Sequence, residues 1–414
     1  YTIVIIILSK LASTSLTMRN IIDGHPVVLF ENDQIYNEEL EKAVKQYVIA
    51  AGAIAASFVI PVIIRKFKKL SEWRNLYAIA GIVSLAIVAV VGQVSYGAKL
   101  GFTVGGISIQ PSELVKIIFV FFVAASFKRS LEFRDIVITT ALAAFHVLIL
   151  VASKDLGAAL IIFVVYLAML YVATRQPLYL AAGLGAGSVA SVAAYYLFGH
   201  VRTRVIVWKD PFASYDNGGY QVAQSLFAIG TGGWFGMGLF QGEPDTIPVA
   251  DEDFIFSAIS EELGLIFALC MILVCVSCYV MFLNIAMQLH NMFYKMVALG
   301  LGTCYIFQVF LTIGGVTKFI PSTGVTLPLV SYGGSSLLST LIMFAIIQGL
   351  YILREDEEED IERKKKERLR AKRSGQENKK RPRKTGDVPE RAQRSQPKGQ
   401  AKGQGKARKE QRIR

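Results

Sequence analysis

The chain has 414 residues, of which 53% are hydrophobic, with a mean hydropathy of +0.44 and a formal net charge of +12. So many long apolar runs exclude an ordinary soluble domain and favour an integral membrane protein. The charge is local, because residues 354–414 hold 23 Lys and Arg against 12 Asp and Glu, whereas the rest of the chain holds 21 against 20. A nearly neutral body argues against a nucleic-acid-binding fold.

Ten segments are apolar enough to cross a hydrocarbon core of about 30 Å as helices, in which every backbone group is hydrogen-bonded internally. The chain begins at Tyr1 rather than Met, so the first segment is interpreted as the remainder of a longer helix. The predicted fold class is an all-α polytopic membrane protein of about ten transmembrane helices, the first one truncated. The predicted spans are 1–16, 46–64, 75–95, 112–127, 136–152, 156–174, 178–198, 254–283, 293–314 and 335–353.

Short basic loops predict the orientation, since Lys and Arg are enriched on the cytoplasmic side. Residues 65–69, 128–134 and Arg175 fall on one side if ten spans are counted, and so does the basic tail. We therefore expect both termini to be cytoplasmic. The opposite side would receive loops 17–45, 96–111, 199–253 and 315–334, of which 199–253 is rich in aromatic residues and glycine.

Two domains follow from this pattern. Residues 1–353 are predicted to form the transmembrane domain, with 199–253 as its large outer loop. Residues 354–414 are predicted to be a disordered, charged cytoplasmic tail, since they contain almost no apolar residue after Leu369. The tail could touch anionic lipid headgroups or could simply be a solvated anchor.

Ionisable residues within membrane segments are costly and mark candidate sites. Glu113 and Lys116 are three residues apart and share a helix face, either as a self-satisfying ion pair or as part of a site. Lys154 and Asp155 form a charged turn in which Asp155 could equally be a helix N-cap. Glu261 and Glu262 lie inside an apolar segment, where buried carboxylates need polar partners.

A run of three acids, 251–253, enters an apolar helix on the predicted outer side. Acids suit a helix N-terminus, but three exceed that need, and Asp253 would lie closest to the hydrocarbon. Desolvation there would raise its pKa and favour a general-base role. Lys318 precedes a Pro-Ser-Thr-Gly turn, and residues 331–336 combine glycine with small polar side chains. These features predict an outer-face polar cavity for an amphipathic anionic substrate. The four cysteines lie in apolar segments, and no metal site is predicted.

Five segments in order resemble the signature blocks of the SEDS family of FtsW, RodA and SpoVE proteins. These are QPSELVK at 110–116, KDLGAAL at 154–160, GYQVAQSLFAIGTGGWFGMGL at 219–239, DFIFSAISEELG at 253–264 and PSTGVTLPLVSYGGSS at 321–336. The resemblance covers about 90–350. The chain departs from many relatives after Lys99, where Leu-Gly-Phe stands in place of an Arg-Trp pair, and before the DFIF block.

The resemblance implies a bacterial plasma-membrane enzyme that polymerises lipid II, the undecaprenyl-pyrophosphate-linked disaccharide-pentapeptide, into glycan strands. It implies that Asp253 is the essential aspartate, activating the acceptor 4-hydroxyl. Glu113 and Lys116 would line the same cavity, supported by Asp155, Glu261 and Glu262. Substrate-binding candidates are Gln110, Ser112, Lys154, Arg202, Arg204, Gln221, Lys318, Ser331, Tyr332, Gly333 and Gly334.

The resemblance also implies a class B penicillin-binding protein as the partner that cross-links the strand. No cofactor is certain, although a Mg or Mn ion could assist departure of the pyrophosphate. Two other functions stay open from the sequence. One is a lipid II flippase, against which the absence of an internal repeat argues. The other is a non-catalytic scaffold for a penicillin-binding protein, which would tolerate loss of Asp253.

Overall fold

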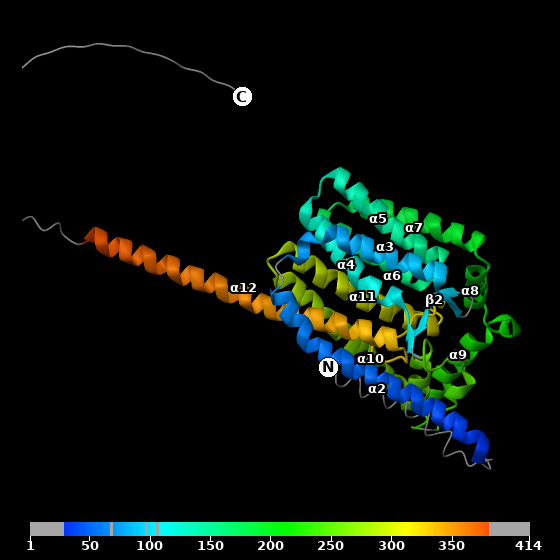
Figure 1. The fold of residues 1–414 in the computed structure, drawn as a ribbon. Helices are drawn as coiled ribbons and strands as arrows, with labels where there is room; N and C mark the ends of the chain where they lie inside the picture. Colours follow the sequence, from blue (N-terminus) through cyan, green and yellow to red (C-terminus); the bar gives the residue numbers. More distant parts are fainter. Residues whose placement is uncertain (1–28, 67–68, 96–97, 105–106, 240, 381–414) are drawn as a thin grey trace, which may run out of the picture. The chain divides into compact units, whose positions relative to one another are not determined.

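The computed structural model describes residues 29–66, 69–95, 98–104, 107–239 and 241–380. The chain divides into two compact units, Tyr1–Glu359 and Asp360–Arg414. The predicted span at 1–16 and the end of the predicted tail at 381–414 lie outside the described residues. The first unit is a helical bundle, and the predicted fold class is confirmed (Figure 1).

Eight described helices are long and apolar enough to cross a membrane, and each overlaps a predicted span. A ninth long helix, α4, carries Glu113, Lys116 and a basic last turn, so charge alone separates it from the other eight. The long helices are α2 (Leu29–Lys66), α3 (Arg74–Val91), α4 (Pro111–Arg129), α5 (Phe133–Ala152), α6 (Leu156–Thr174), α7 (Pro177–Leu197), α10 (Ile255–Gln288), α11 (Met292–Val316) and α12 (Gly334–Lys380). The chain is a multi-pass membrane protein.

Helix α4 lies at the centre of the bundle, packed against α3, α5, α6 and α11 (Figure 1). Phe119, Phe122 and Val123 on this helix are fully buried. A helix that is apolar on every face is buried in a protein core or spans a membrane, and the apolar middle of α4 is buried within the bundle. Its two charged residues near the N-terminal end are therefore enclosed by protein rather than by lipid.

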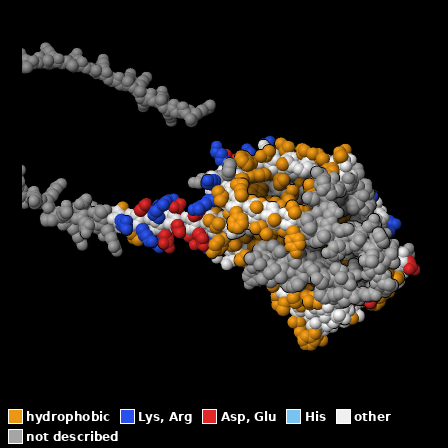
Figure 2. All heavy atoms as spheres, turned by 60° about the horizontal axis from the view of Figure 1, so that its bottom comes forward, with side chains coloured by type: hydrophobic (Ala, Val, Ile, Leu, Met, Phe, Trp, Pro, Cys, Tyr) orange, Lys and Arg blue, Asp and Glu red, His pale blue; other side chains and the backbone are white. Residues whose placement is uncertain are grey.

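The outer surface of the bundle is apolar. In Figure 2 hydrophobic side chains cover most of the described part of the visible face, and Lys, Arg, Asp and Glu gather at its margins. Helix α7 has no buried residue, and its Gly183 and Gly187 pack on α6 side chains. Such a surface is suited to lipid, which does not compete for hydrogen bonds.

The connection from α3 to α4 contains a small antiparallel sheet that the all-α prediction did not include. Its strands β1 (Gln93–Ser95), β2 (Ala98–Val104) and β3 (Ile107–Ile109) pair in chain order. The loop 199–253 is also structured, with α8 (Gly199–Lys209), η2 (Tyr215–Asn217), α9 (Tyr220–Gly232) and η3 (Pro244–Thr246). A further 3-10 turn, η1 (Leu70–Glu72), precedes α3.

Two predicted loop or tail boundaries need correction. Residues 29–45, placed in an outer loop, are helical and continuous with the span at Gln46–Lys66, because Glu, Leu, Lys and Ala in this stretch are good helix formers. Residues 354–380, placed in a disordered tail, continue helix α12. Exposed pairs such as Asp360–Arg363 and Glu362–Lys366 at helical spacing support that continuation.

Candidate active site

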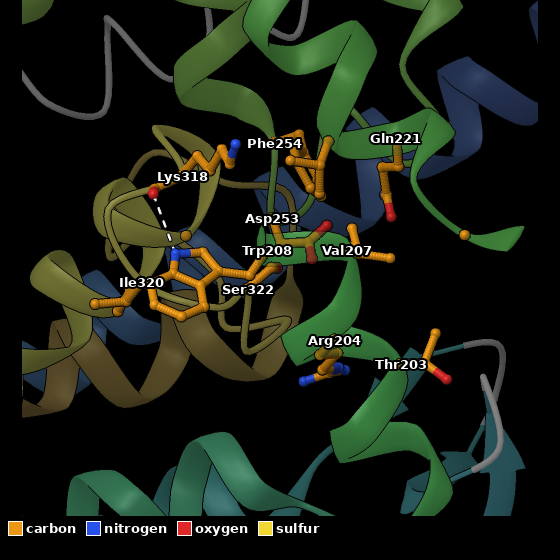
Figure 3. Close-up of a pocket in the computed structure, with 13 residues that line it drawn as sticks. Thr203, Arg204, Val207, Trp208, Gln221, Asp253, Phe254, Lys318, Ile320 and Ser322 are labelled. Atoms are coloured by element: carbon orange, nitrogen blue, oxygen red, sulfur yellow. Dashed lines mark hydrogen bonds between the residues drawn. The ribbon is translucent and has the colours of Figure 1, made fainter. Parts of the chain in front are cut away.

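A pocket of about 120 Å³ opens where α8, α9, the start of α10 and the chain after α11 meet (Figure 3). Segments far apart in sequence supply its walls, so it exists only in the folded bundle. Its lining combines one carboxylate, two cations, an indole, an amide and hydroxyl groups. The lining residues are Thr203, Arg204, Val207, Trp208, Gly218, Gln221, Val222, Asp253, Phe254, Gly315, Lys318, Ile320 and Ser322.

Asp253 lies in the turn immediately before α10, so its carboxyl group is at the entrance to a membrane span. Burial is the main reason that the pKa of Asp253 is raised to about 6, and it outweighs the lowering effects of a backbone hydrogen bond and the Arg204 cation. Most of the group is therefore ionised at neutral pH, yet it is a stronger base than an ordinary carboxylate. This is the environment that the acidic run predicted.

Arg204 faces Asp253 across Gly324. A Cβ at Gly324 would lie 3.4 Å from Nη2 of Arg204 and 3.7 Å from Oδ2 of Asp253. Gly324 adopts φ +68, which other residues rarely adopt. The absence of a side chain here therefore permits this backbone conformation and leaves room beside Arg204 and Asp253. Arg204 also experiences Asp155, and the two carboxylates oppose the lowering of its pKa by burial.

Trp208 and Lys318 form the opposite wall of the pocket. The indole Nε1 of Trp208 donates a hydrogen bond to the carbonyl oxygen of Lys318 at 3.2 Å (Figure 3). Lys318 has φ 58, an uncommon conformation for a residue with a side chain. At the third side, Gln221 donates to the carbonyl oxygen of Pro248 at 2.6 Å. The structure thus brings the predicted Asp253, Arg204, Gln221 and Lys318 together.

Glu113 and Lys116 form a buried ion pair beneath this region. Lys116 Nζ donates to Oε1 of Glu113 at 2.9 Å and to Oε1 of Gln308 at 2.7 Å. Ser339 donates to the other carboxylate oxygen of Glu113 at 2.9 Å. The lysine side chain is only 2% exposed, so the pair joins α4, α11 and α12 through satisfied polar contacts.

Asp155 forms a second buried polar group beside the first. Its carboxylate accepts from Ser112 Oγ at 2.9 Å, from Gln110 Nε2 at 3.5 Å and from the backbone N–H of Ala158 at 3.1 Å. The last contact makes it the N-cap of α6, the alternative that the sequence left open. Burial raises the pKa of Asp155, and its hydrogen bonds with Ala158 and Ser112 lower it.

Several predicted residues lie outside the pocket lining. The Arg202 guanidinium lies 5.8 Å from the centre of the Tyr195 ring, on another side of α8 from Arg204. Ser331 accepts a hydrogen bond from the N–H of Leu327, and the N–H of Tyr332 donates to the carbonyl oxygen of Asp251. These contacts fix the loop before α12. Gly333 lies in the same loop, Gly334 is the first residue of α12, and Lys154 is exposed at the turn after α5.

Glu261 and Glu262 are buried in α10, one turn or more beyond the pocket. The side chain of Glu261 packs on Gly242, where a Cβ would lie 3.1 Å from its carboxyl carbon. Neither residue lines the pocket, so neither would directly contact a substrate bound there.

Trp208, Ser322 and His200 were not among the sequence candidates. Trp208 follows Arg204 by four residues and His200 precedes it by four, so helical spacing on α8 was the signal available. Burial lowers the pKa of His200, and Arg204 and Lys154 lower it further, which places this imidazole near both cations. Ser322 comes from the chain after α11, and its position depends on tertiary packing.

A family model described as cell cycle protein, FtsW/RodA/SpoVE, matches residues 5–355. The chain belongs to this family. It is 36% identical over 339 residues to the Peptidoglycan glycosyltransferase RodA of Mycobacterium leprae, covering 78% of this chain and 72% of that protein. It is 32% identical over 311 residues to the Probable peptidoglycan glycosyltransferase FtsW of Aliivibrio salmonicida, covering 70% and 75%.

Solved structures share the fold. A chain from a structure reported as structural coordination of polymerization and crosslinking by a peptidoglycan synthase complex matches with a TM-score of 0.65 and 23% identity, covering 84% of this chain and 97% of that one. The Rod shape determining protein RodA of Thermus thermophilus matches with a TM-score of 0.57 and 21% identity, covering 85% and 96%. At these identities the likeness concerns the fold.

Proposed function

We propose that this chain is a peptidoglycan glycosyltransferase that polymerises lipid II into glycan strands, with Asp253 as the general base. The observation that carries the proposal is a raised-pKa carboxylate facing a guanidinium in a pocket at one end of a membrane bundle. Membership of the FtsW/RodA/SpoVE family and the names of its relatives support the same reaction.

In this reaction the acceptor 4-hydroxyl oxygen bonds to the anomeric carbon of the donor sugar. The bond from that carbon to the pyrophosphate oxygen breaks, and its electron pair leaves with undecaprenyl pyrophosphate. The hydroxyl proton passes to Asp253, whose raised pKa suits proton transfer near neutral pH. Arg204 and Lys318 supply positive charge for the pyrophosphate from two walls of the pocket.

The buried groups are positioning residues in this scheme. Asp155 lies close enough to Arg204 to raise the pKa of its guanidinium, and Ser112 donates a hydrogen bond to the Asp155 carboxylate. The Glu113–Lys116 pair anchors the helix that carries Ser112. A fixed guanidinium loses less freedom when it binds an anion, so these groups would lower the cost of binding.

A resident metal does not fit the pocket. Its lining offers a single carboxylate, and within the described part of the chain no group of three His, Cys, Asp or Glu side chains is arranged to hold a metal ion. Magnesium is often carried by substrate phosphates instead. We propose that any Mg or Mn ion enters with the pyrophosphate.

The pocket would face outward, with both termini in the cytoplasm. Basic residues at the opposite end of the bundle support this orientation, since Lys128 donates to Ser71 and Arg65 pairs with Asp356 there. A class B penicillin-binding protein would cross-link the product. The similar chain from a synthase complex described as polymerizing and crosslinking supports such a partner.

The test is to purify the chain with its partner, supply lipid II and resolve the products on a gel. We expect a ladder of glycan polymer from the wild type and none from Asp253→Asn. Equal polymer from both would overturn the assignment of Asp253. No polymer from either, together with movement of lipid II across liposomes, would replace the enzyme with a flippase.

A further inference from the structure

Residues 232–239, called here the interfacial segment, run beside a break in α10. Helix α10 is interrupted at Gly264, which has φ 79 and ψ 175. The N–H groups of Met237 and Gly238 donate to the carbonyl oxygens of Glu261 and Glu262 at 2.9 and 3.0 Å. The carbonyl groups that lose their helical partners at the break are therefore hydrogen-bonded by the interfacial segment.

N–H groups of α10 also donate hydrogen bonds to carbonyl oxygens of the interfacial segment. The N–H of Leu265 donates to the carbonyl oxygen of Gly233 at 2.9 Å, and that of Ile266 donates to Trp234 at 3.3 Å. Four backbone hydrogen bonds thus join the interfacial segment to α10, two before the break and two after it. In a region without water such pairing is what permits a broken helix.

Glycine is required on both sides of this junction. A Cβ at Gly264 would lie 2.3 Å from the backbone nitrogen of Gly236, and one at Gly236 would lie 2.1 Å from the carbonyl oxygen of Glu262. Both glycines have positive φ, near +80. The interfacial segment is consequently held in one position against α10.

The side chains of this fixed segment point away from the protein. Trp234 is 65% exposed and Phe235 is 83% exposed, and Met237 and Leu239 are exposed beside them. The apolar surface of α10 continues from this patch, because Leu265, Ile266 and Leu269 are also exposed. The two surfaces are joined directly by the hydrogen bonds from Leu265 and Ile266.

The length of α10 sets the depth of the segment. From Gln288 back to Leu265 an unbroken helix rises about 35 Å. The hydrocarbon core is about 30 Å thick, so with Gln288, whose side chain accepts a hydrogen bond from Arg354, at one boundary, Leu265 lies close to the other. Trp234, hydrogen-bonded to Ile266, must lie at that same level, where tryptophan is enriched in membrane proteins.

We propose that Trp234 and Phe235 insert into the bilayer leaflet on the pocket side of the membrane, at the boundary between acyl chains and headgroups. The occupant of this apolar patch is lipid, because the patch is continuous with the membrane-facing surface of α10. Helix α9 leads from the segment to Gln221 and Val222 in the pocket wall. If the proposed function holds, the insertion sets the height of that wall relative to a lipid-linked pyrophosphate.

Tryptophan fluorescence in proteoliposomes tests the insertion without any assay of catalysis. The chain has 3 Trp, so the wild type and Trp234→Phe are compared in vesicles of phosphatidylcholine brominated either near the headgroup end or near the methyl end of its acyl chains. Trp234→Tyr serves as a second variant with an interfacial side chain. Far-ultraviolet circular dichroism confirms that each variant is folded.

We expect the bromine-sensitive part of the emission to fall sharply in both variants, with headgroup-end bromine the stronger quencher in the wild type. An unchanged bromine-sensitive part would overturn the insertion. Protection of Trp234 at every protein-to-lipid ratio would also overturn it, and would point to cover by protein. Because catalysis is not measured, either result is independent of the role of Asp253.

Discussion

The carboxylate of Asp253 and the guanidinium of Arg204 approach the same glycine, Gly324, from two different elements. A Cβ at that position would lie within 3.7 Å of both groups. One is a base with a raised pKa, and the other is a permanent cation beside it. A site that must remove a proton and hold a leaving anion needs both functions within one pocket.

The pH dependence should report Asp253. Because the base must be deprotonated, the polymerisation rate is expected to fall about tenfold per pH unit below an apparent pKa of about 6. Arg204 lowers the pKa of Asp253, so Arg204→Gln should move this limb to higher pH. Initial rates of polymer formation across pH measure both effects.

Arg202→Gln is the matched control for that experiment. It removes the same charge from the same helix, but its guanidinium lies over Tyr195 rather than in the pocket. The acid limb should stay in place. A shift of equal size in both variants would mean that general surface charge, and not contact with Asp253, controls the limb.

Gly324→Ala should impair the site. The positive φ of Gly324 costs alanine about 1 kcal/mol, and the new methyl group would fill the space between Arg204 and Asp253. We expect the polymerisation rate of this variant to fall by more than the loss of folded protein accounts for. Gly185→Ala is the control, since a Cβ there meets nothing within 4 Å. Equal rates for the two variants would contradict the prediction.

Removing one member of the buried ion pair should destabilise the bundle. Lys116→Met leaves the Glu113 carboxylate buried without its cation, which costs about 3–5 kcal/mol. The double variant Glu113→Gln with Lys116→Met removes both charges and should recover part of that loss. Thermal unfolding in detergent micelles ranks the stabilities of the wild type, the single variant and the double variant. A double variant less stable than the single one would contradict it.

Gly264→Ala should destabilise the protein more than an ordinary helix substitution. Its methyl group would meet the backbone nitrogen of Gly236 at 2.3 Å, and backbone cannot move aside as a side chain can. Gly52→Ala in α2, where a Cβ meets nothing within 4 Å, is the control. Thermal unfolding should separate the two variants, and equal stability would show that the break is tolerant.

Most of the bundle was predictable because each span is a long apolar run that must be helical in lipid. The break in α10 was not, because it depends on hydrogen bonds from residues 232–239, which come from a different part of the chain. The helical stretch 29–45 was missed since its charged residues resemble a loop in a hydropathy reading, although their helix propensity is high.

The sequence indicated individual residues of the site, but it did not show which of them lie together in the pocket. The acidic run indicated Asp253, yet sequence could not choose between Arg202 and Arg204. These residues are two positions apart and lie on different sides of α8, so only the packing of that helix decides which one enters the pocket. Trp208 and Ser322 were missed for a similar reason, because their elements meet only in the folded bundle.

The role of Asp253 as general base is tested by the initial rate of glycan polymer formation from lipid II by Asp253→Asn, compared with wild type at equal folded fraction. Asn keeps the size of the side chain and removes the base. Loss of general-base catalysis predicts a fall of at least about a hundredfold, whereas Asp251→Asn, outside the pocket lining, should stay within a few-fold of wild type. A rate for Asp253→Asn within a few-fold of wild type would mean that Asp253 is not the general base.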